Sequence, residues 1–541
     1  RKWFVEAIAS AQRGIEIGRR LGNDETGQDF VNNGLLHLGH IMRTAGNYSD
    51  ALRAFDQVIE FYQHSKKQAY LYGATKGRLL ALMAQGNYPA ARVELERVLA
   101  LYEQFRENIL EESNRNSFFD QEQGTYDIAT DFAYSMLNDP EQAYIYAELS
   151  RARSLLDEVT GVSLSVEGPQ HPELLIQAKV RPGGSEFLRR EMPDQVQLIE
   201  YAVLNDKLIV WLISRDCFAS QAINLSTNGL KGVINNYLTL MRQKPGKTDQ
   251  RWREQAAELY DFLIRPIAHL LDGRKHLCVA PDKILTRLPF GTLINRNSGR
   301  MLIEDYLVSY APSASVFLEL TAKAKLKASV TQERLLAVGN PSFDRTVFRD
   351  LDSVPATLVG AARIARFYVH PRLLVEKQAT KTAVLHEMQK ADVVHLAMHY
   401  VPDPWSPMYS RLPLAAEDAA LDDGVLQLHE LYRLRLERPR LVVLAACQTN
   451  GESYYDGEGA IGVSRLFEAV GVPLVIASLW SVDSEATSEL MVTFHRFRKR
   501  AGQPTIEALR RAQLELFNRA DEYRHPYYWA AFVAVGGYGN Y

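Results

Sequence analysis

Two stretches in the last third of the chain, DVVHLAMH at residues 392–399 and PRLVVLAAC at residues 439–447, are almost unbroken apolar runs of strand length. PLVIASLW (473–480) and WAAFVAVGG (529–537) follow the same pattern. Strands without polar alternation are typical of a parallel sheet that helices cover on both faces. SRLFEAVG (464–471) and TSELMVTFHRFRKRA (487–501) supply helices between them. The pattern predicts a doubly wound α/β domain.

The first two of these strands end in reactive side chains, His399 and Cys447. Sites in open α/β sheets form just beyond the carboxyl ends of the strands. If the two strands are neighbours, the imidazole can take the thiol proton and so create a nucleophile. The alternative is that a cysteine at a strand end merely fills space in the core. We expect that alternative for Cys217 and Cys278, and we expect His395, deeper in the sheet, to be inert.

The front third of the chain repeats itself. LLHLGHIMRTAGNYSDALRAFDQVIEFY (35–62) aligns with KGRLLALMAQGNYPAARVELERVLALY (76–102), and their Gly-Asn-Tyr triplets begin 40 residues apart, at residues 46 and 86. Each unit reads as helix, turn, helix, with a small residue four positions before a large one: Ala51 before Phe55, and Ala91 before Leu95. A weaker third unit occupies 124–159. The pattern resembles the tetratricopeptide repeat, a helical hairpin that buries its apolar face by stacking on neighbours.

Composition limits the function classes. A chain of 541 residues needs several domains, and 46% hydrophobic with 23% charged residues is ordinary for a globular protein. The formal net charge of −3 gives no reason to expect a nucleic-acid partner. No apolar run approaches membrane-spanning length. Three cysteines make no disulfide framework, so we expect a cytoplasmic protein without a metal site. Because the chain starts at Arg1, we also expect that it is a fragment.

A family resemblance extends this interpretation. HLAMHY (395–400), LVVLAACQTNGE (441–452) and the stretch from GEGAIGVSRLF to SLWSVDSEAT (457–487) resemble the CHAT-domain proteins. CVAPDKILTRLPFGTLI (278–294), LLAVGNPSF (335–343) and YYWAAFVAVGGYG (527–539) match in the same order. These proteins are caspase-like cysteine peptidases, related to separases and often fused to tetratricopeptide repeats. The resemblance implies repeats at 1–160, a linker at 161–195, a non-catalytic half at 196–370 and a catalytic caspase-like half at 371–541.

The resemblance also implies roles for single residues. His399 matches the family's general base and Cys447 its nucleophile, while the backbone N–H groups of Tyr400 and Cys447 would hold the oxyanion. The family usually has glycine after the histidine. Tyr400 keeps the N–H group but tolerates fewer backbone conformations. Either the local geometry suits Tyr400, or the site is rearranged until something activates it.

SLWSVDSEAT matches the stretch that lines the substrate pocket in the separase relatives. A buried arginine or lysine of a substrate needs a paired carboxylate, so Asp483 and Glu485 predict cleavage after a basic residue. The alternative is that Asp483 caps the helix that begins after it, because Asp-Ser-Glu is a favourable helix start.

The leading hypothesis is therefore a cysteine endopeptidase, without a cofactor, that cleaves a specific protein substrate. Its activity would be regulated by a protein partner on the repeats, and the resemblance points to bacterial defence or programmed cell death. The alternative is a catalytically silent scaffold whose α/β domain only binds. A scaffold would need neither His399 nor Cys447.

Overall fold

The computed structural model describes residues 2–22, 24–65, 67–108, 124–151, 153–160, 184–244, 250–403, 407–417, 423–446, 453–455, 459–461, 463–539 and 541. Of these, the residues up to Tyr146 form one compact unit and those from Ala147 onward form a second. No helix among the described residues is long and apolar enough to cross a membrane.

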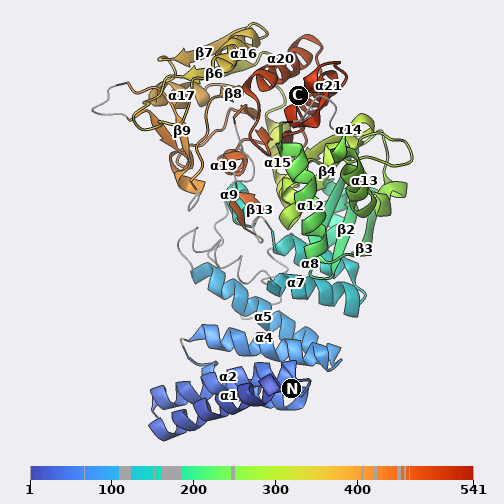
Figure 1. The fold of residues 1–541 in the computed structure, drawn as a ribbon, viewed down its shortest axis with the longest axis vertical. Coiled ribbons are helices and arrows are strands. Elements are labelled where there is room, and N and C mark those ends of the chain that lie inside the picture. The colour runs from blue at the N-terminus through green and yellow to red at the C-terminus, as the bar shows by residue number, and fades with distance from the viewer. Residues whose placement is uncertain are drawn as a thin grey trace. The chain divides into compact units, whose positions relative to one another are not determined.

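The first unit is a stack of helices, drawn in blue to cyan in Figure 1. Its helices are α1 (Lys2–Leu21), α2 (Glu25–Thr44), α3 (Tyr48–Tyr62), α4 (Gln68–Ala84), α5 (Tyr88–Asn108), α7 (Gly124–Asp131), a π-helical turn (Phe132–Met136) and most of α8 (Pro140–Leu149). The two Gly-Asn-Tyr triplets lie at the α2–α3 and α4–α5 turns, where Gly46 and Gly86 have φ of +82° and +79°. The helix–turn–helix repeats predicted from the sequence are confirmed.

The spacing of small and large residues explains how these helices stack. Phe55 and Ala51 are fully buried on α3. A Cβ atom built on Gly39 of α2 would lie 2.7 Å from the Phe55 ring, and one on Gly77 of α4 would lie 2.5 Å from it. The ring therefore fills the space that two glycines leave open on the neighbouring helices, so α2, α3 and α4 can pack closely.

The second unit is built on an 11-stranded sheet in the order β3-β2-β1-β4-β5-β15-β14-β11-β8-β6-β7. Its strands are β1 (Val196–Val203), β2 (Lys207–Ile213), β3 (Phe218–Asn224), β4 (His276–Ala280), β5 (Leu307–Tyr310), β6 (Arg334–Pro341), β7 (His370–Glu376), β8 (Val393–Ala397), β11 (Leu441–Leu444), β14 (Leu474–Ser478) and β15 (Phe532–Gly536). Most neighbours are parallel. β15 pairs with β14 in the antiparallel direction, as β2 does with β1 and β3.

Helices cover both faces of this sheet. They are α9 (Arg153–Thr160), α11 (Gly184–Glu191), α12 (Thr227–Arg242), α13 (Arg251–Leu263), α14 (Leu302–Asp305), α15 (Ala314–Leu326), α16 (Pro355–Ala365), α17 (Lys381–Met388), α18 (Leu428–Leu431), α19 (Val463–Ala469), α20 (Ser484–Arg500) and α21 (Thr505–Phe517). Alternate residues of one strand belong to different cores: Leu335 of β6 packs with α16 and α20, whereas Leu336 packs with α17 and α19. The predicted α/β class is confirmed, with a mostly parallel sheet after a helical N-terminal region.

Short elements complete the second unit. They are the 3-10 turns η2 (Arg265–Leu270), η3 (Lys283–Arg287), η4 (Phe290–Thr292), η5 (Pro407–Tyr409), η6 (Glu522–Arg524) and η7 (Pro526–Tyr528), and the paired strands β9 (Arg411–Pro413) with β10 (Val425–Gln427) and β12 (Ser453–Tyr455) with β13 (Gly459–Ile461). The boundary between the two halves at residue 370 stays a prediction. Strand β6, which precedes that boundary in the chain, pairs with β7 and β8.

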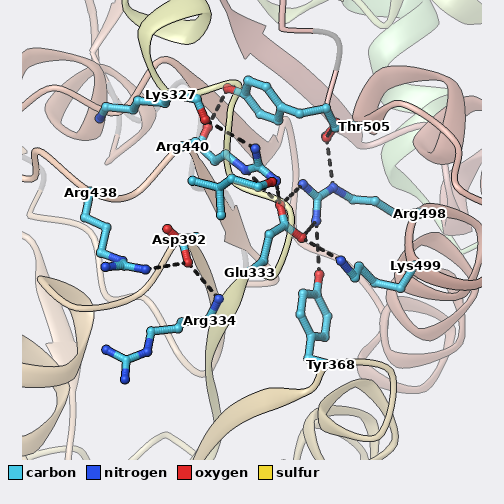
Figure 2. Close-up of polar contacts among 12 residues, drawn as sticks. Lys327, Glu333, Arg334, Tyr368, Asp392, Arg438, Arg440, Arg498, Lys499 and Thr505 are labelled. Atoms are coloured by element: carbon cyan, nitrogen blue, oxygen red, sulfur yellow. Dashed lines mark hydrogen bonds and ion pairs between the residues drawn. The ribbon is translucent and has the colours of Figure 1, made fainter.

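A buried charge cluster closes the amino ends of the central strands (Figure 2). Glu333, which precedes β6, accepts hydrogen bonds from Arg440 (2.8 Å), Arg498 (2.5 Å) and Lys499 (3.1 Å). Arg440 precedes β11, and Arg498 and Lys499 lie on α20. Arg498 also donates to the hydroxyl of Tyr368 at 3.2 Å. One carboxylate thus joins two strands and a helix at the end of the sheet opposite to His399.

Candidate active site

The two strands that precede the predicted catalytic residues are direct neighbours. β8 and β11 are parallel, and Leu396 pairs with Leu444. His399 follows Leu396 by three residues, and Cys447 follows Leu444 by three. Because the two strands share a register, the chain continues toward both positions at the same carboxyl end of the sheet. Cys447 itself lies outside the described residues.

A backbone carbonyl holds the imidazole of His399. Nε2 of the half-buried His399 lies 2.6 Å from the carbonyl oxygen of Asp352, in the loop between β6 and α16. A carbonyl can only accept a hydrogen bond, so Nε2 carries the proton and donates it. The Phe343 ring meets the imidazole edge-on, with 5.6 Å between ring centroids. Nδ1 then carries no proton and can accept one. A base that deprotonates a thiol needs such a nitrogen.

The approach to Cys447 is also fixed through a backbone group. The hydroxyl of Ser478, at the end of β14, donates to the carbonyl oxygen of Ala446 at 2.7 Å, and both residues are buried. Ala446 is the last described residue before Cys447. Ser478 therefore anchors the chain directly before the predicted nucleophile to the neighbouring strand.

Tyr400 has an ordinary backbone conformation. The described non-glycine residues with positive φ are Asn138, Lys283, Asn340 and Glu376, and Tyr400 is not one of them. A Cβ atom adds no left-handed strain at this position. The side chain of Tyr400 is buried among apolar residues. The choice between a site that already suits Tyr400 and one that is rearranged until it is activated stays a prediction. The oxyanion role of Tyr400 and Cys447 stays a prediction.

Asp483 caps α20. Its Oδ1 accepts hydrogen bonds from the backbone N–H groups of Glu485 (3.0 Å) and Ala486 (2.9 Å). The capping alternative is thus observed, and the pocket role of Asp483 and Glu485 stays a prediction. Burial and then the charges of Asp483, Glu485 and Glu522 raise the pKa of Tyr523, while the charge of Arg519 lowers it. Burial, with Glu522 and Asp483, raises the pKa of Tyr528 to about 12.

Cys278 and His395 lie in buried surroundings that favour their neutral state. Burial raises the pKa of the Cys278 thiol to about 12, which keeps it protonated and unreactive. Cys217 is half-buried. Burial lowers the pKa of His395 to about 3, and its Nδ1 lies 3.4 Å from Nε2 of His495, a second buried histidine. His395 packs inside the sheet, on the α20 side.

Sequence reasoning missed Asp352 and Ser478. Asp352 contributes a main-chain carbonyl from 47 residues before His399, so its side-chain identity carries no signal for this contact. Ser478 could have been found, because it is a polar residue in the otherwise apolar run PLVIASLW. A hydroxyl at the end of a buried strand needs a hydrogen-bond partner there.

Comparisons with known proteins agree with this architecture. Residues 253–537 match the family described as CHAT domain. The human protein named tetratricopeptide repeat protein 28 is 26% identical in an alignment 324 residues long, which covers 51% of this chain and 13% of that protein. This chain therefore corresponds to a small part of that relative.

A solved structure with a similar fold covers nearly the whole chain. The separase–securin complex of Saccharomyces cerevisiae aligns over 99% of this chain and 52% of the matched chain, with a TM-score of 0.50 and 10% identity. The Arg-specific cysteine proteinase gingipain R aligns over 57% of this chain and 75% of its own, with a TM-score of 0.33 and 10% identity, too low to carry an argument. The first alignment covers both units and spans about half of the matched chain.

Proposed function

Because the chain belongs to the CHAT domain family, we propose that it is a cysteine endopeptidase in which Cys447 is the nucleophile and His399 the general base. The observation that carries the proposal is the position of His399. It lies at the carboxyl end of a strand that neighbours the strand leading to Cys447, and its Nε2–H group is already bound to a carbonyl. Nδ1 is left to take the thiol proton, and the resulting thiolate would attack a peptide carbonyl.

The proposed substrate is a specific protein that is cleaved after a basic residue. The acidic surroundings of Tyr523, made by Asp483, Glu485 and Glu522, support a pocket for a guanidinium or ammonium group. Asp483 would act through its negative charge while Oδ1 caps the helix.

We further propose that a protein partner on the repeats regulates the enzyme. Large apolar side chains are exposed on this unit, among them Phe30 at 51% and Val93 at 56%. Repeat stacks often present such surfaces to other proteins. A cytoplasmic role in bacterial defence or programmed cell death is the setting that the family resemblance favours.

Peptide ketone inhibitors that carry Arg, Lys or Asp beside the reactive group test the proposal. The purified chain would be treated with each, and adducts read by intact mass and peptide mapping, with Cys447→Ala and His399→Ala as controls. A single adduct on Cys447 from the Arg or Lys inhibitor, absent from Cys447→Ala, is the expected result. An adduct from the Asp inhibitor alone would keep the peptidase and refute the basic pocket.

A silent scaffold is the competing function. It predicts no adduct on Cys447, whereas equal labelling of all three cysteines would indicate an unfolded chain. Cys278 is a useful internal reference, because its fully buried thiol should stay unlabelled in a folded chain.

A further inference from the structure

One side chain holds the loop that presents Asp352 to His399. Oδ1 of Asn340, at the end of β6, accepts a hydrogen bond from the backbone N–H of Val354 at 2.8 Å and another from the hydroxyl of Ser353 at 3.1 Å. Asn340 is buried, with 7% of its surface exposed. The two residues that directly follow Asp352 are thus fixed to the end of the strand.

The backbone of Asn340 is tied to the same loop. Its N–H donates to Oγ1 of Thr357 at 3.0 Å, and that hydroxyl donates to the carbonyl of Val354 at 2.8 Å. Asn340 has φ of +46°, a left-handed conformation that asparagine tolerates better than most residues. At the preceding Gly339, a Cβ atom would lie 2.8 Å from the Thr357 carbonyl. The close approach of the end of β6 to the start of α16 thus requires glycine at 339 and favours asparagine at 340.

We propose that Asn340 is a positioning residue for His399. By holding residues 353 and 354, it sets the place of the Asp352 carbonyl, and that carbonyl keeps the imidazole proton on Nε2. Without the Asn340 acceptor, the loop would shift and the proton would distribute between Nε2 and Nδ1. Fewer molecules would then present a free Nδ1. The catalytic consequence rests on the proposed function, whereas the effect on the His399 ring does not.

The first readout needs no activity. The full chain would be labelled with ¹⁵N-histidine, and the His399 signal would be identified among the 13 histidines by its loss in His399→Ala. The ¹⁵N shifts report which ring nitrogen carries the proton. We expect the Nε2–H form in the wild type, a mixture in Asn340→Gly, and the wild-type form in Asn340→Asp. Aspartate keeps the acceptor oxygen and tolerates the left-handed backbone, while glycine keeps only the backbone freedom.

The second readout is the pH dependence of Cys447 alkylation by the Arg ketone inhibitor. We expect Asn340→Gly to react about 10- to 100-fold more slowly, the range for a small misplacement of a catalytic group, and Asn340→Asp to restore the rate. Asn138→Gly is a matched control, because Asn138 is an exposed left-handed asparagine in the first unit, with φ of +53°.

Two outcomes would overturn the proposal: a pure Nε2–H form in Asn340→Gly, or a loss in Asn340→Asp as large as that in Asn340→Gly. If Asn340→Gly is less stable but the His399 tautomer is unchanged, Asn340 has only a structural role. If wild-type Cys447 does not react at all, the proposed function fails. The tautomer measurement then still decides the role of Asn340.

Discussion

Replacing Glu333 by glutamine should destabilise the second unit strongly. The substitution keeps the size of the side chain and removes its charge. Glu333 is 1% exposed and binds three cations, of which Arg440 and Arg498 are also buried and Lys499 is partly exposed. After the change, these cations would face each other without a counter-charge.

The magnitude follows from the ionisation of the carboxyl group. Burial alone would raise the pKa of Glu333, but the hydrogen bonds and charges of Arg498, Arg440 and Lys499 outweigh it and lower the pKa from 4.5 to about 2. Each pKa unit corresponds to about 1.4 kcal/mol, so the charged form contributes roughly 3 kcal/mol at neutral pH. Breaking a buried ion pair by removing one partner typically costs about 3–5 kcal/mol. Both routes predict a loss of about 3–5 kcal/mol.

The assay is urea unfolding followed by tryptophan fluorescence, because Trp211, Trp252, Trp480 and Trp529 are all buried in the second unit. Glu515→Gln is the matched control. Glu515 also binds an arginine of α20, Arg496, but at 45% exposure, where a pair is worth at most about 1 kcal/mol.

The pH dependence provides a second check on Glu333. The folded-state pKa is depressed, so the stabilisation is complete above about pH 4.5 and is lost as the pH falls toward 2. The difference between wild type and Glu333→Gln should therefore narrow over that range. The reasoning is refuted if, at pH 7, Glu333→Gln lowers the free energy of unfolding by an amount within about 1 kcal/mol of the effect of Glu515→Gln. It is also refuted if the difference between wild type and Glu333→Gln stays constant down to pH 3.

Three further predictions address other parts of the molecule. Phe55→Ala should lower the free energy of unfolding of the first unit by about 3–5 kcal/mol, because the ring is fully buried. In an unfolding experiment, circular dichroism should then show helix loss before the tryptophan signal changes. A single common transition would contradict this. Lowering the pH from 7.5 to 5.5 should lower the free energy of unfolding of the second unit by about 4 kcal/mol. Burial lowers the pKa of His276 to about 4, that of His395 to about 3 and that of His495 well below its usual value, so all three bind protons only when unfolded. Urea midpoints that do not change with pH would rule this out. Asp483→Asn should slow labelling of Cys447 by the Arg ketone about tenfold or more, because one charge pair is lost while asparagine still caps α20. An unchanged preference across the Arg, Lys and Asp inhibitors would refute the pocket role of Asp483.

Much of the fold could be predicted because its signals are local. The Gly-Asn-Tyr turns and the i, i+4 pair of Ala51 and Phe55 lie within single helical hairpins, and the structure has them as expected. The apolar runs before His399 and Cys447 predicted buried strands and left open whether these are neighbours; in the structure β8 and β11 are paired. That the chain runs toward His399 and toward position 447 at the same end of the sheet follows only from the parallel register of β8 and β11.

The remaining features depend on contacts between distant segments. An apolar run that is buried on both faces looks the same in either direction, so the sequence did not reveal that β15 runs antiparallel to β14. The Asp352 carbonyl is a main-chain group, and its role depends on where Asn340 fixes a loop. Glu333 reads as an ordinary surface glutamate until β6, β11 and α20 bring three cations to it.

The antiparallel junction between β14 and β15 has a consequence for symmetry. β14, β11, β8 and β6 run in one direction, and β15, β5, β4 and β1 run in the other. In an isologous dimer, a twofold axis relates the two subunits. The two parallel half-sheets, joined edge to edge in opposite directions, are related in the same way. Here one chain supplies both half-sheets, so β15 of the same chain pairs with the edge of β14. Among the described residues, the outer strands of this sheet are β3 and β7, which are therefore the edges at which a second copy would extend it.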